Sequence, residues 1–416
     1  NQAYWNLSGL WSGWLWGRES ISALRNTLLK QRYDWTWHTK SLSAVLQHLA
    51  RLISTETPVL LQIGELDQLF LLAGILGAQD AGLKLNAVAL DGEATTLQTQ
   101  WQIGQTAQAK TDPEEFSRSA RESAIQYLAD RGEPAPYLPL FSATILGLQT
   151  EGRLAGQPEL QPNGTLNELE AQIDKILSNS SAFSRFNPGV TADAGQYWLS
   201  QPVQNKASLA DQAEGHILSK LQALSTMSLG QIFQAVNEEL PGFLTPEDEL
   251  ISSILESYAT AKPGTDPAEW HLLEGEDGKT RQRDVQEMER LIINLAERLN
   301  YEVRTGKDVI QWLEADGQEV YSFFTLTTTM ISKLVQAHAK NPGRKLIVLP
   351  GSRSNLISFK LKRDPNLQQL VKEDWQFVKF RQMRNLNENP LLSRELFASQ
   401  IMEDPPEFRS SQLALF

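Results

Sequence analysis

The chain lacks cysteine altogether, although it is 416 residues long. That absence excludes disulfide scaffolds, thiol catalysis and cysteine-ligated zinc, and nothing in the sequence requires an oxidising compartment. Long apolar runs are also missing, since no stretch approaches the roughly 18 consecutive apolar residues of a membrane-spanning helix. With 41% hydrophobic and 21% charged residues, the composition predicts a soluble, cytoplasmic protein of several domains.

Motifs for metal and phosphate chemistry are absent as well. The histidines fall in separate predicted elements without paired ligand spacing, which predicts no metal site; they are His38, His48, His216, His271 and His338. No Gly-rich phosphate loop and no serine nucleophile motif occurs. The segment Leu349-Pro350-Gly351-Ser352-Arg353 ends a predicted strand and opens a helix, so its backbone amides are a candidate phosphate contact without the Walker lysine. The chain therefore carries no complete catalytic constellation.

The first residues contain neither an initiator methionine nor a basic and apolar leader. They read Asn1-Gln2-Ala3-Tyr4-Trp5. This start predicts that no signal peptide is present, and it leaves open that the sequence is a piece of a longer protein.

The net charge of −12 is spread unevenly. Residues 111–284 carry 12 basic and 26 acidic side chains, whereas 341–386 concentrate 10 basic against 3 acidic ones. Because salt screens charges beyond about 10 Å, a local basic stripe can bind a polyanion even on an acidic chain. We therefore predict a DNA-binding stripe, with a solvated helix face as the alternative; its residues are Arg353, Lys360, Lys362, Arg363, Lys379, Arg381 and Arg384.

Apolar patterning predicts an α/β domain over 1–105. A buried strand at 58–64 is followed by a helix at 67–81 and by two alternating strands, 83–90 and 96–103, around the Asp91-Gly92 turn. Together with a helical stretch over 4–53, this is the order of the back half of a doubly wound, Rossmann-like sheet that ends in an antiparallel hairpin.

The middle of the chain predicts two helical, winged-helix-like domains, at 106–205 and 206–274. In each, three predicted helices precede a short β segment, with the hairpin strands 183–186 and 196–199 in the first and an extended stretch at 270–273 in the second. Any small helical domain can have this order, and the acidic charge argues against both copies gripping DNA. An assembly or spacer role is the alternative.

A C-terminal α/β domain is predicted over 279–416. Its long first helix, 280–299, precedes three strands, the last two of which are joined by an Asp316-Gly317 hairpin turn. Alternating helices and strands then continue to a strand at 376–380.

Several segments of the sequence resemble those of bacterial DNA amino-methyltransferase-like proteins of the Asp-Pro-Pro-motif class. The resemblance is carried by Trp11-Ser12-Gly13-Trp14-Leu15-Trp16-Gly17-Arg18-Glu19 and by Tyr33-Asp34-Trp35-Thr36-Trp37-His38. It extends to Gly242-Phe243-Leu244-Thr245-Pro246 and to the 349–356 segment. In these proteins the stretch that resembles the first residues of this chain, Asn1-Gln2-Ala3-Tyr4-Trp5, directly follows the Asp-Pro-Pro catalytic motif.

The resemblance implies the rear of a methyltransferase domain, cut after the catalytic motif. Such enzymes transfer a methyl group from S-adenosylmethionine to the exocyclic amino group of adenine or cytosine on a flipped-out base. Neither the Gly-containing cofactor loop nor Asp-Pro-Pro is present, so no catalytic residue is assigned, and we expect this chain alone to be inactive and to bind no cofactor. Tyr4 and Trp5 would lie beside the missing motif, where they either line the base or cofactor pocket or pack the sheet.

The C-terminal element order resembles a restriction-endonuclease-like core. Such nucleases gather Mg²⁺ with an acid on the second strand and Glu-x-Lys on the third. Here the third strand reads Tyr321-Ser322-Phe323-Phe324-Thr325-Leu326, without acid or lysine, and only Asp308, Glu314 and Asp316 remain nearby. We therefore expect a degenerate, non-cutting version that binds DNA through phosphates.

Two hypotheses follow for the whole chain. In the first, it belongs to a DNA methyltransferase, together with a missing N-terminal catalytic half, and residues 106–416 supply DNA engagement. In the second, it is a non-catalytic DNA-binding or assembly module of a DNA modification or defence system. No membrane partner is expected.

Overall fold

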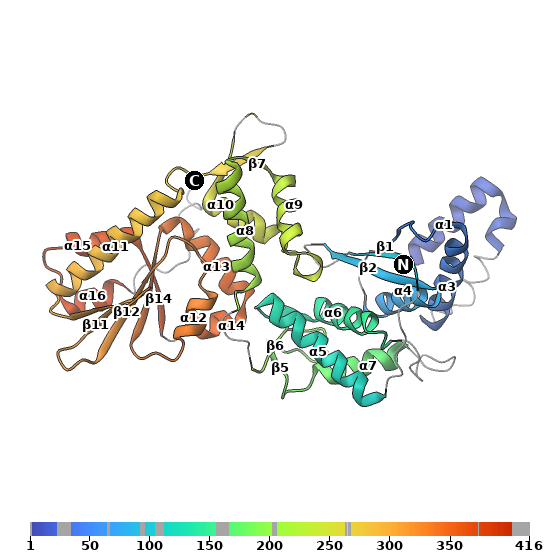
Figure 1. The fold of residues 1–416 in the computed structure, drawn as a ribbon, viewed down its shortest axis with the longest axis horizontal. Helices are drawn as coiled ribbons and strands as arrows, with labels where there is room; N and C mark the ends of the chain where they lie inside the picture. The colour runs from blue at the N-terminus through green and yellow to red at the C-terminus, as the bar shows by residue number, and fades with distance from the viewer. Residues whose placement is uncertain are drawn as a thin grey trace. The chain divides into compact units, whose positions relative to one another are not determined.

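The computed structural model describes most of the chain as a mixed α/β protein with several small sheets (Figure 1). The described residues are 2–22, 35–64, 67–91, 96–104, 112–154, 166–201, 206–262, 264, 268–372 and 374–401. They divide into two compact units. One comprises Asn1–Ala87, Gln98–Ala120 and Ile145–Ile176, and the other comprises Val88–Leu97, Arg121–Thr144 and Leu177–Phe416. These interleaved units do not assign limits to the four predicted domains, which stay predictions.

The N-terminal region contains a three-stranded sheet in which the last strand is central. The strand order is β1-β3-β2, with β1 at Val59–Ile63, β2 at Leu83–Leu90 and β3 at Leu97–Ile103. The helices of this region are α1 (Gln2–Trp16), the 3-10 helix η1 (Arg18–Ile21), α3 (Trp35–Leu52) and α4 (Gln68–Asp80). All three strands lie where the apolar pattern predicts them.

Helix α4 is the centre of this region. Its residues 71–78 are all buried, as expected for a helix that is apolar on every side. It packs against α3. A side chain at Gly77 would place its Cβ only 3.0 Å from Cβ of Leu42, so glycine allows the two helices to approach closely.

Strands β2 and β3 form the predicted antiparallel hairpin. The Asp91 amide donates to the Thr96 carbonyl at 3.0 Å, and the Gly104 amide donates to the Gly82 carbonyl at 3.0 Å. Because these bonds close the two ends of the ladder, the strands run in opposite directions. The predicted turn itself, at 92–95, lies outside the described residues.

Two further three-stranded sheets share one pattern. In each, the chain order is helix, strand, helix, helix, strand, strand, and the third strand lies between the other two, giving β4-β6-β5 and β7-β9-β8. The first set is α5 (Pro113–Arg131), β4 (Ala135–Pro136), α6 (Tyr137–Thr150), α7 (Leu166–Leu177), β5 (Phe183–Phe186) and β6 (Gln196–Leu199). The second set is α8 (Leu209–Leu224), β7 (Met227–Ser228), α9 (Leu229–Glu239), the 3-10 helix η3 (Gly242–Leu244), α10 (Asp248–Tyr258), β8 (Ala259–Ala261) and β9 (Glu269–Leu272).

The C-terminal region is built on a five-stranded sheet of order β10-β11-β12-β13-β14. Its first three strands are antiparallel, whereas β12, β13 and β14 are parallel. The strands are β10 (Glu302–Thr305), β11 (Ile310–Leu313), β12 (Glu319–Thr325), β13 (Arg344–Leu349) and β14 (Trp375–Lys379). The helices are α11 (Gly278–Arg298), α12 (Ser332–His338), the 3-10 helix η4 (Gly351–Arg353), α13 (Ser354–Arg363), α14 (Pro365–Val371), α15 (Phe380–Glu388) and α16 (Arg394–Gln400).

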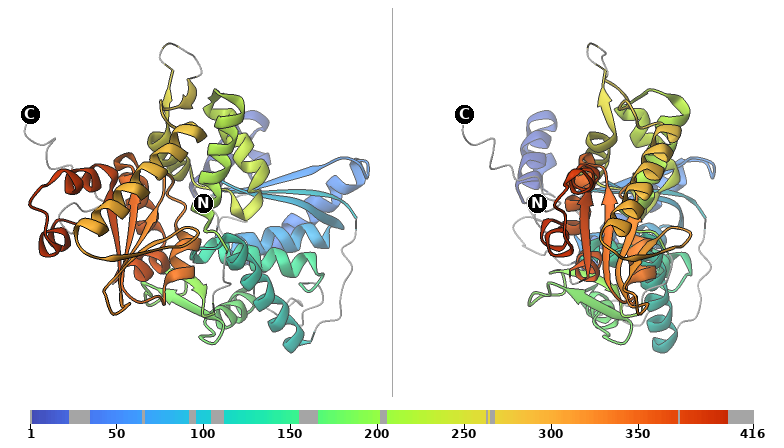
Figure 2. Two further views of the ribbon diagram at one scale, coloured as in Figure 1. Left: turned by 60° about the vertical axis from the view of Figure 1, so that its left-hand side comes forward. Right: turned by 90° about the vertical axis from the view of Figure 1, so that its left-hand side faces the viewer.

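Helices cover both faces of this sheet (Figure 2). Successive side chains of a strand point to opposite faces, so Phe323 belongs to the core under α11, α15 and α16, while Phe324 belongs to the core under α12, α13 and α14. Leu346 and Ile347 divide in the same way. The near-continuous apolar runs of β12 and β13 are thus explained by burial on both faces.

Helix α13 joins this sheet to the region formed by α8, α9 and α10, which we call the second three-helix region; α5, α6 and α7 form the first. Ile357 packs in the core of the sheet, whereas the adjacent Leu356 packs in the core formed by α8, α9 and α10. One helix therefore contributes to two hydrophobic cores, and the side chains between these faces are shielded from water.

Gly132 allows a test of how closely the end of α5 approaches the segment that precedes α8. It ends α5 with a φ of +69°, and a Cβ there would lie 2.1 Å from the Ala207 carbonyl oxygen. Gly132→Ala should destabilise the protein by roughly 3 kcal/mol, because a left-handed backbone and a backbone clash both oppose the methyl group. The control Gly317→Ala has a φ of +84° with no heavy atom within 4 Å and should cost only about 1 kcal/mol. Urea denaturation measures both; equal losses would contradict the close approach.

Candidate functional site

A buried ammonium group is the centre of the most highly organised polar cluster. Lys360, on α13, is 1% exposed and lies between two carboxylates of α8. Its Nζ donates to Oδ1 of Asp211 at 2.6 Å, to Oε2 of Glu214, and to the Thr329 carbonyl at 3.1 Å. The two acids are one helical turn apart, so they face the same lysine.

The other carboxylate oxygens of these acids are also hydrogen-bonded. Oδ2 of Asp211 accepts from the amide and the hydroxyl of Ser332, at 2.8 and 2.6 Å. Glu214 accepts from the Thr329 amide at 2.8 Å and from the hydroxyls of Thr329 and Tyr258. Such saturation is what a buried charge requires, because an unpaired one costs several kcal/mol.

These contacts act on the two acids in opposite directions. Burial raises the pKa of Asp211, and the neighbouring Lys360 only partly opposes it. Burial would also raise the pKa of Glu214, but Lys360, Thr329 and Tyr258 outweigh it and lower that pKa. Neither carboxylate is open to solvent, and their hydrogen bonds join α8 to α13 and to the segment that leads into α12.

A second buried cation extends the cluster toward α11. Arg353, fully buried, lies over the Tyr258 ring with its guanidinium carbon 3.6 Å from the ring centroid. It donates to the Thr327 carbonyl at 3.0 Å, to a backbone carbonyl of α10 and to the Glu276 carboxylate. The same carboxylate accepts from Arg281 at 2.8 Å.

A third branch reaches the end of α5. Glu133 is 1% exposed and accepts from Arg363 at 2.8 Å and from the Ala210 amide at 3.1 Å. Arg131 lies 3.3 Å from the same carboxylate. Burial would raise the pKa of Glu133, but Arg363 and Arg131 outweigh it and lower that pKa. We call the whole set the buried ion network; it comprises Arg131, Glu133, Asp211, Glu214, Glu276, Arg353, Lys360 and Arg363.

The predicted DNA-binding residues are mostly inside or paired within the protein. Arg353 and Lys360 belong to the buried ion network, and Lys379 is 7% exposed. Arg363 is bonded to Glu133 and to Glu247. A duplex reaches only accessible cations, so in this structure these four do not form the exposed stripe that the charge count predicts.

The remaining three predicted residues lie nearer the surface. Lys362 and Arg381 are exposed, and Arg384 is half-exposed with its Nε 3.0 Å from Oε1 of Glu287. None of these placements tests DNA binding by the chain, which stays a prediction.

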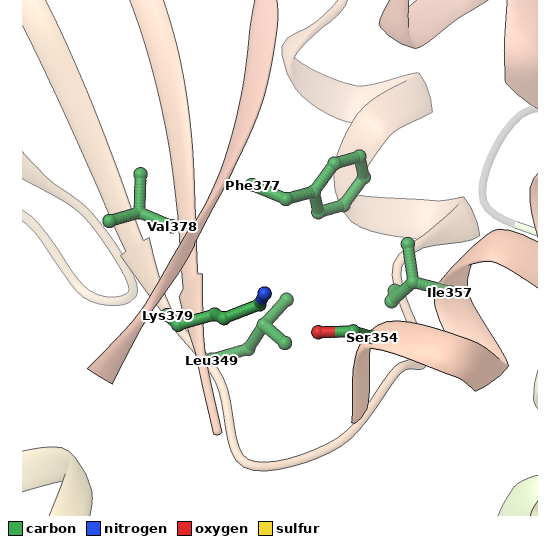
Figure 3. Close-up of a pocket in the computed structure, with 6 residues that line it drawn as sticks. All are labelled: Leu349, Ser354, Ile357, Phe377, Val378 and Lys379. Atoms are coloured by element: carbon green, nitrogen blue, oxygen red, sulfur yellow. The ribbon is translucent and has the colours of Figure 1, made fainter. Parts of the chain in front are cut away.

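Two amides at the end of the candidate phosphate segment 349–353 are already hydrogen-bonded. The Arg353 amide donates to the Pro350 carbonyl at 3.0 Å, and the Ser354 amide donates to the Gly351 carbonyl. The hollow beside it, between β13, β14 and α13, is lined by Leu349, Ser354, Ile357, Phe377, Val378 and Lys379 (Figure 3). The hollow is too small for a water molecule, so a phosphate would not bind inside it, and the phosphate contact at the exposed residues Gly351 and Ser352 stays a prediction.

The acids of the predicted degenerate nuclease site are not gathered around a common point. Both oxygens of Glu314 are bonded to Arg394, at 2.9 and 3.0 Å, and Asp316 accepts from the Gln318 amide within the turn. Asp308 is exposed. Within the described ranges, no group of three or more histidines and carboxylates could hold a metal ion.

Two other predictions concern the N-terminal aromatic side chains and the absence of a membrane partner. Tyr4 and Trp5 lie in the range of α1, but their side chains are outside the described part, so their pocket role stays a prediction. Among the helices that the structure describes, none is long and apolar enough to cross a membrane.

Comparison with protein-family models, with curated proteins and with solved structures found no match to this chain.

Sequence reasoning misses the acids that pair with the basic residues. Asp211 and Glu214 are 149 and 146 residues before Lys360, and Glu133 is 230 residues before Arg363. One signal is available: acids on the apolar face of a predicted amphipathic helix, as Asp211 and Glu214 are on α8, indicate buried pairing. The sequence does not identify the partner.

Removing the ammonium group of Lys360 should show how strongly the stability of the protein depends on this buried charge. Lys360→Met would leave Asp211 and Glu214 buried without a counter-ion and should cost about 3 to 5 kcal/mol at pH 7. The loss should shrink toward pH 4, because protonation of the two acids removes the unpaired charge. Denaturant unfolding at both pH values measures this. Lys362→Met, at the exposed neighbour, should change stability by less than about 1 kcal/mol; a pH-independent loss at Lys360 would contradict the ionic interpretation.

Asp364, the buried N-cap of α14, should give stability the opposite pH dependence. Burial, and next the charge of Glu133, raise its pKa from 3.8 to about 7. Its contribution to stability is therefore fully present below pH 3.8 and is lost as the pH rises through about 7. Asp364→Asn keeps a cap for the Leu367 amide, at 2.9 Å in the native protein, but cannot ionise.

The variant and the native protein should therefore diverge with pH. We expect similar stabilities near pH 4 and a more stable variant at pH 8, by up to about 4 kcal/mol. Urea unfolding across this range checks the expectation. A constant difference between the two proteins would mean that Asp364 does not titrate in the folded state.

Proposed function

We propose that this chain is the rear part of an S-adenosylmethionine-dependent DNA amino-methyltransferase, and that its central and C-terminal regions engage DNA. The target would be the exocyclic amino group of adenine or cytosine. The catalytic motif and the cofactor loop would come from a further polypeptide segment.

The strand order of the N-terminal sheet carries this proposal. In methyltransferase sheets the seventh and last strand is inserted between the fifth and the sixth. The order β1-β3-β2, with the last strand central and antiparallel to β2, agrees with that arrangement if β1 is the fifth strand. Simple hairpin addition would instead place the last strand at the edge of the sheet, although the two other three-stranded sheets of the chain also have their last strand in the middle.

Exposed apolar side chains in the same region support a missing partner. Of the 15 large apolar side chains that are exposed in the described part of the chain, nine lie between Leu10 and Leu60. They include Trp14 and Trp16 on α1, 75% and 73% exposed, and Leu60 on β1, 77% exposed. Exposed apolar groups concentrated in one region usually mark an interface, and the catalytic half is the cover that the proposal supplies.

The residues present do not make a cofactor cradle by themselves. Helix α4, which follows β1, begins at the N-cap Asp67, whose carboxylate accepts from the amides of Leu69 and Phe70 at 3.0 and 3.1 Å. A helix start that is already capped by a carboxylate does not offer its amides to another anion. S-adenosylmethionine would therefore be held by the further segment, and no step of methyl transfer is assigned to this chain.

The two three-helix regions resemble DNA-binding domains in their strand order but not in their charge. Their shared order, with the third strand between the first and the second, is that of winged-helix domains. The third helix of each is acidic, however: α7 carries Glu168, Glu170 and Asp174, and α10 carries Asp248 and Glu249. Because acidic helices are repelled by phosphates, these regions are better suited to spacing and assembly than to reading the major groove.

That acidity is the observation that favours the second candidate function. A non-catalytic assembly module of a DNA modification or defence system would use the winged-helix-like regions to bind protein. It would need no methyl donor, so methyl transfer separates the two candidates.

Reconstitution tests the proposal directly. This chain alone should transfer no tritiated methyl group from S-adenosylmethionine to duplex DNA, whereas its mixture with a segment that carries the Gly-rich loop and Asp-Pro-Pro should do so. Replacing the motif's aspartate by alanine is the negative control. A stable mixture that binds DNA without methylating it would favour the assembly module.

The apolar surface gives this experiment a matched pair of variants. Trp14→Ser should weaken co-purification of the two segments by at least about tenfold, because a large ring would be lost from their interface. Val190→Ser, at a fully exposed position elsewhere, should leave co-purification unchanged.

A further inference from the structure

A polar groove runs between α11 and α15 on the face of the C-terminal sheet that these helices cover. It has a volume of about 390 Å³, and its polar lining residues are Arg283, Gln286, Glu287, Arg290, Asn294 and Asn387. The lining is thus mainly guanidinium and carboxamide groups, with a single carboxylate.

Helical periodicity explains why these groups share one face. Positions 283, 287, 290 and 294 recur every three or four residues along α11. The opposite face of the helix carries Met288, Ile292 and Leu295, which are buried in the core of the sheet. The groove is therefore on a helix held by its apolar face, with its polar side chains directed to solvent.

Two arginines of the groove are free to bind a ligand. Arg283 and Arg290 are exposed, and neither has an ion-pair or hydrogen-bond partner within the described part of the chain. The groove's carboxylate is already neutralised, because Arg384 bonds Glu287 at 3.0 Å. The guanidinium group of Arg353, by contrast, is hydrogen-bonded to the Thr327 carbonyl and the Glu276 carboxylate inside the protein.

The far end of the groove is fixed by the backbone. Arg298 donates to the carbonyls of Asn387 and Asn389, at 2.5 and 2.7 Å, and so ties the C-terminal end of α15 to the end of α11. Asn387 is thereby held beside the same groove as Asn294, and the groove has a defined width before any ligand binds.

The chemistry of the groove matches a phosphodiester backbone. Arg283 and Arg290 are seven residues apart, which is about 10.5 Å along a helix axis, a span that covers several phosphates of one strand. Guanidinium forks bind phosphate oxygens, and the NH₂ groups of the carboxamides donate to further phosphate oxygens. An acidic peptide pairs with guanidinium groups as well and donates its backbone amides to carboxamide oxygens, so polyglutamate is the competitor in the test below.

We propose that the groove between α11 and α15 binds the phosphodiester backbone of a nucleic acid. This inference rests on the proposed function, since it assigns the DNA engagement of that proposal to specific residues. It also replaces the buried part of the predicted basic stripe with accessible cations on another helix.

Fluorescence anisotropy with a labelled duplex tests the groove. Arg283→Gln combined with Arg290→Gln should weaken binding by the full chain about tenfold at low salt and reduce the salt slope by about 1 for each arginine lost. The matched control is Arg304→Gln combined with Lys307→Gln, which removes the same charge from two exposed positions on and just after β10 and should leave affinity and slope unchanged. Thermal unfolding confirms that both variants are folded.

The outcomes separate this inference from the function on which it rests. If the native chain binds the duplex and the groove variant binds equally well, the groove assignment is overturned while DNA engagement stands. If the native chain binds no duplex at all, both are overturned. If a labelled polyglutamate binds as tightly as the duplex and loses as much in the groove variant, the site takes acidic protein and the nucleic-acid assignment fails.

The absence of cysteine allows an independent measurement. Asn294→Cys would introduce the only thiol of the chain, so a photo-crosslinker attached there reports contact at the groove alone. We expect a crosslink to the duplex from this position and none from Thr305→Cys on β10. Equal crosslinking at both positions would overturn the assignment.

Discussion

The pairing of Lys360 with two buried carboxylates is the interaction on which the rest of the C-terminal half depends. The lysine comes from α13 and both acids come from α8, so the ion pair joins the five-stranded sheet to the second three-helix region. Thr329 and Ser332 add bonds from the segment that leads into α12. Buried ion pairs contribute little net stability compared with apolar packing, but breaking one is costly. We infer that this ion pair acts mainly by selecting one arrangement of the helices that share it.

This constraint also decides which basic residues can act outward. A guanidinium or ammonium group that is saturated by buried carboxylates cannot exchange them for phosphate without leaving those carboxylates unpaired. The local excess of basic over acidic residues in 341–386 therefore does not measure binding capacity, because the neutralising acids come from 133–276. Accessible charge is found instead on α11, where Arg283 and Arg290 have no partners among the described residues.

Sequence patterns predict the elements far better than the contacts among side chains. The strand at 58–64 and the hairpin strands 183–186 and 196–199 are present as β1, β5 and β6, because apolar runs and alternation are local signals. The two-residue strands β4 and β7 escape prediction, since such short segments have no periodicity. Helix α14 escapes it too, although Asp364 before its first-turn proline is a recognisable start. The burial of Lys360 cannot be predicted, because its partners are set by tertiary packing over about 150 residues of chain.

The buried ion network and the α11–α15 groove are connected through the start of α11. Glu276 bonds Arg353, and the next residue, Asp277, caps α11 by accepting from the amides of its first turn, both at 3.0 Å. The first turn of α11 is thereby fixed to the end of α10, where Arg353 lies over Tyr258. Arg283 follows the cap by less than two turns, so its position is fixed by the same contacts. A polyanion bound along α11 would therefore have a defined orientation relative to the second three-helix region, which is what a module that presents DNA to a catalytic partner requires.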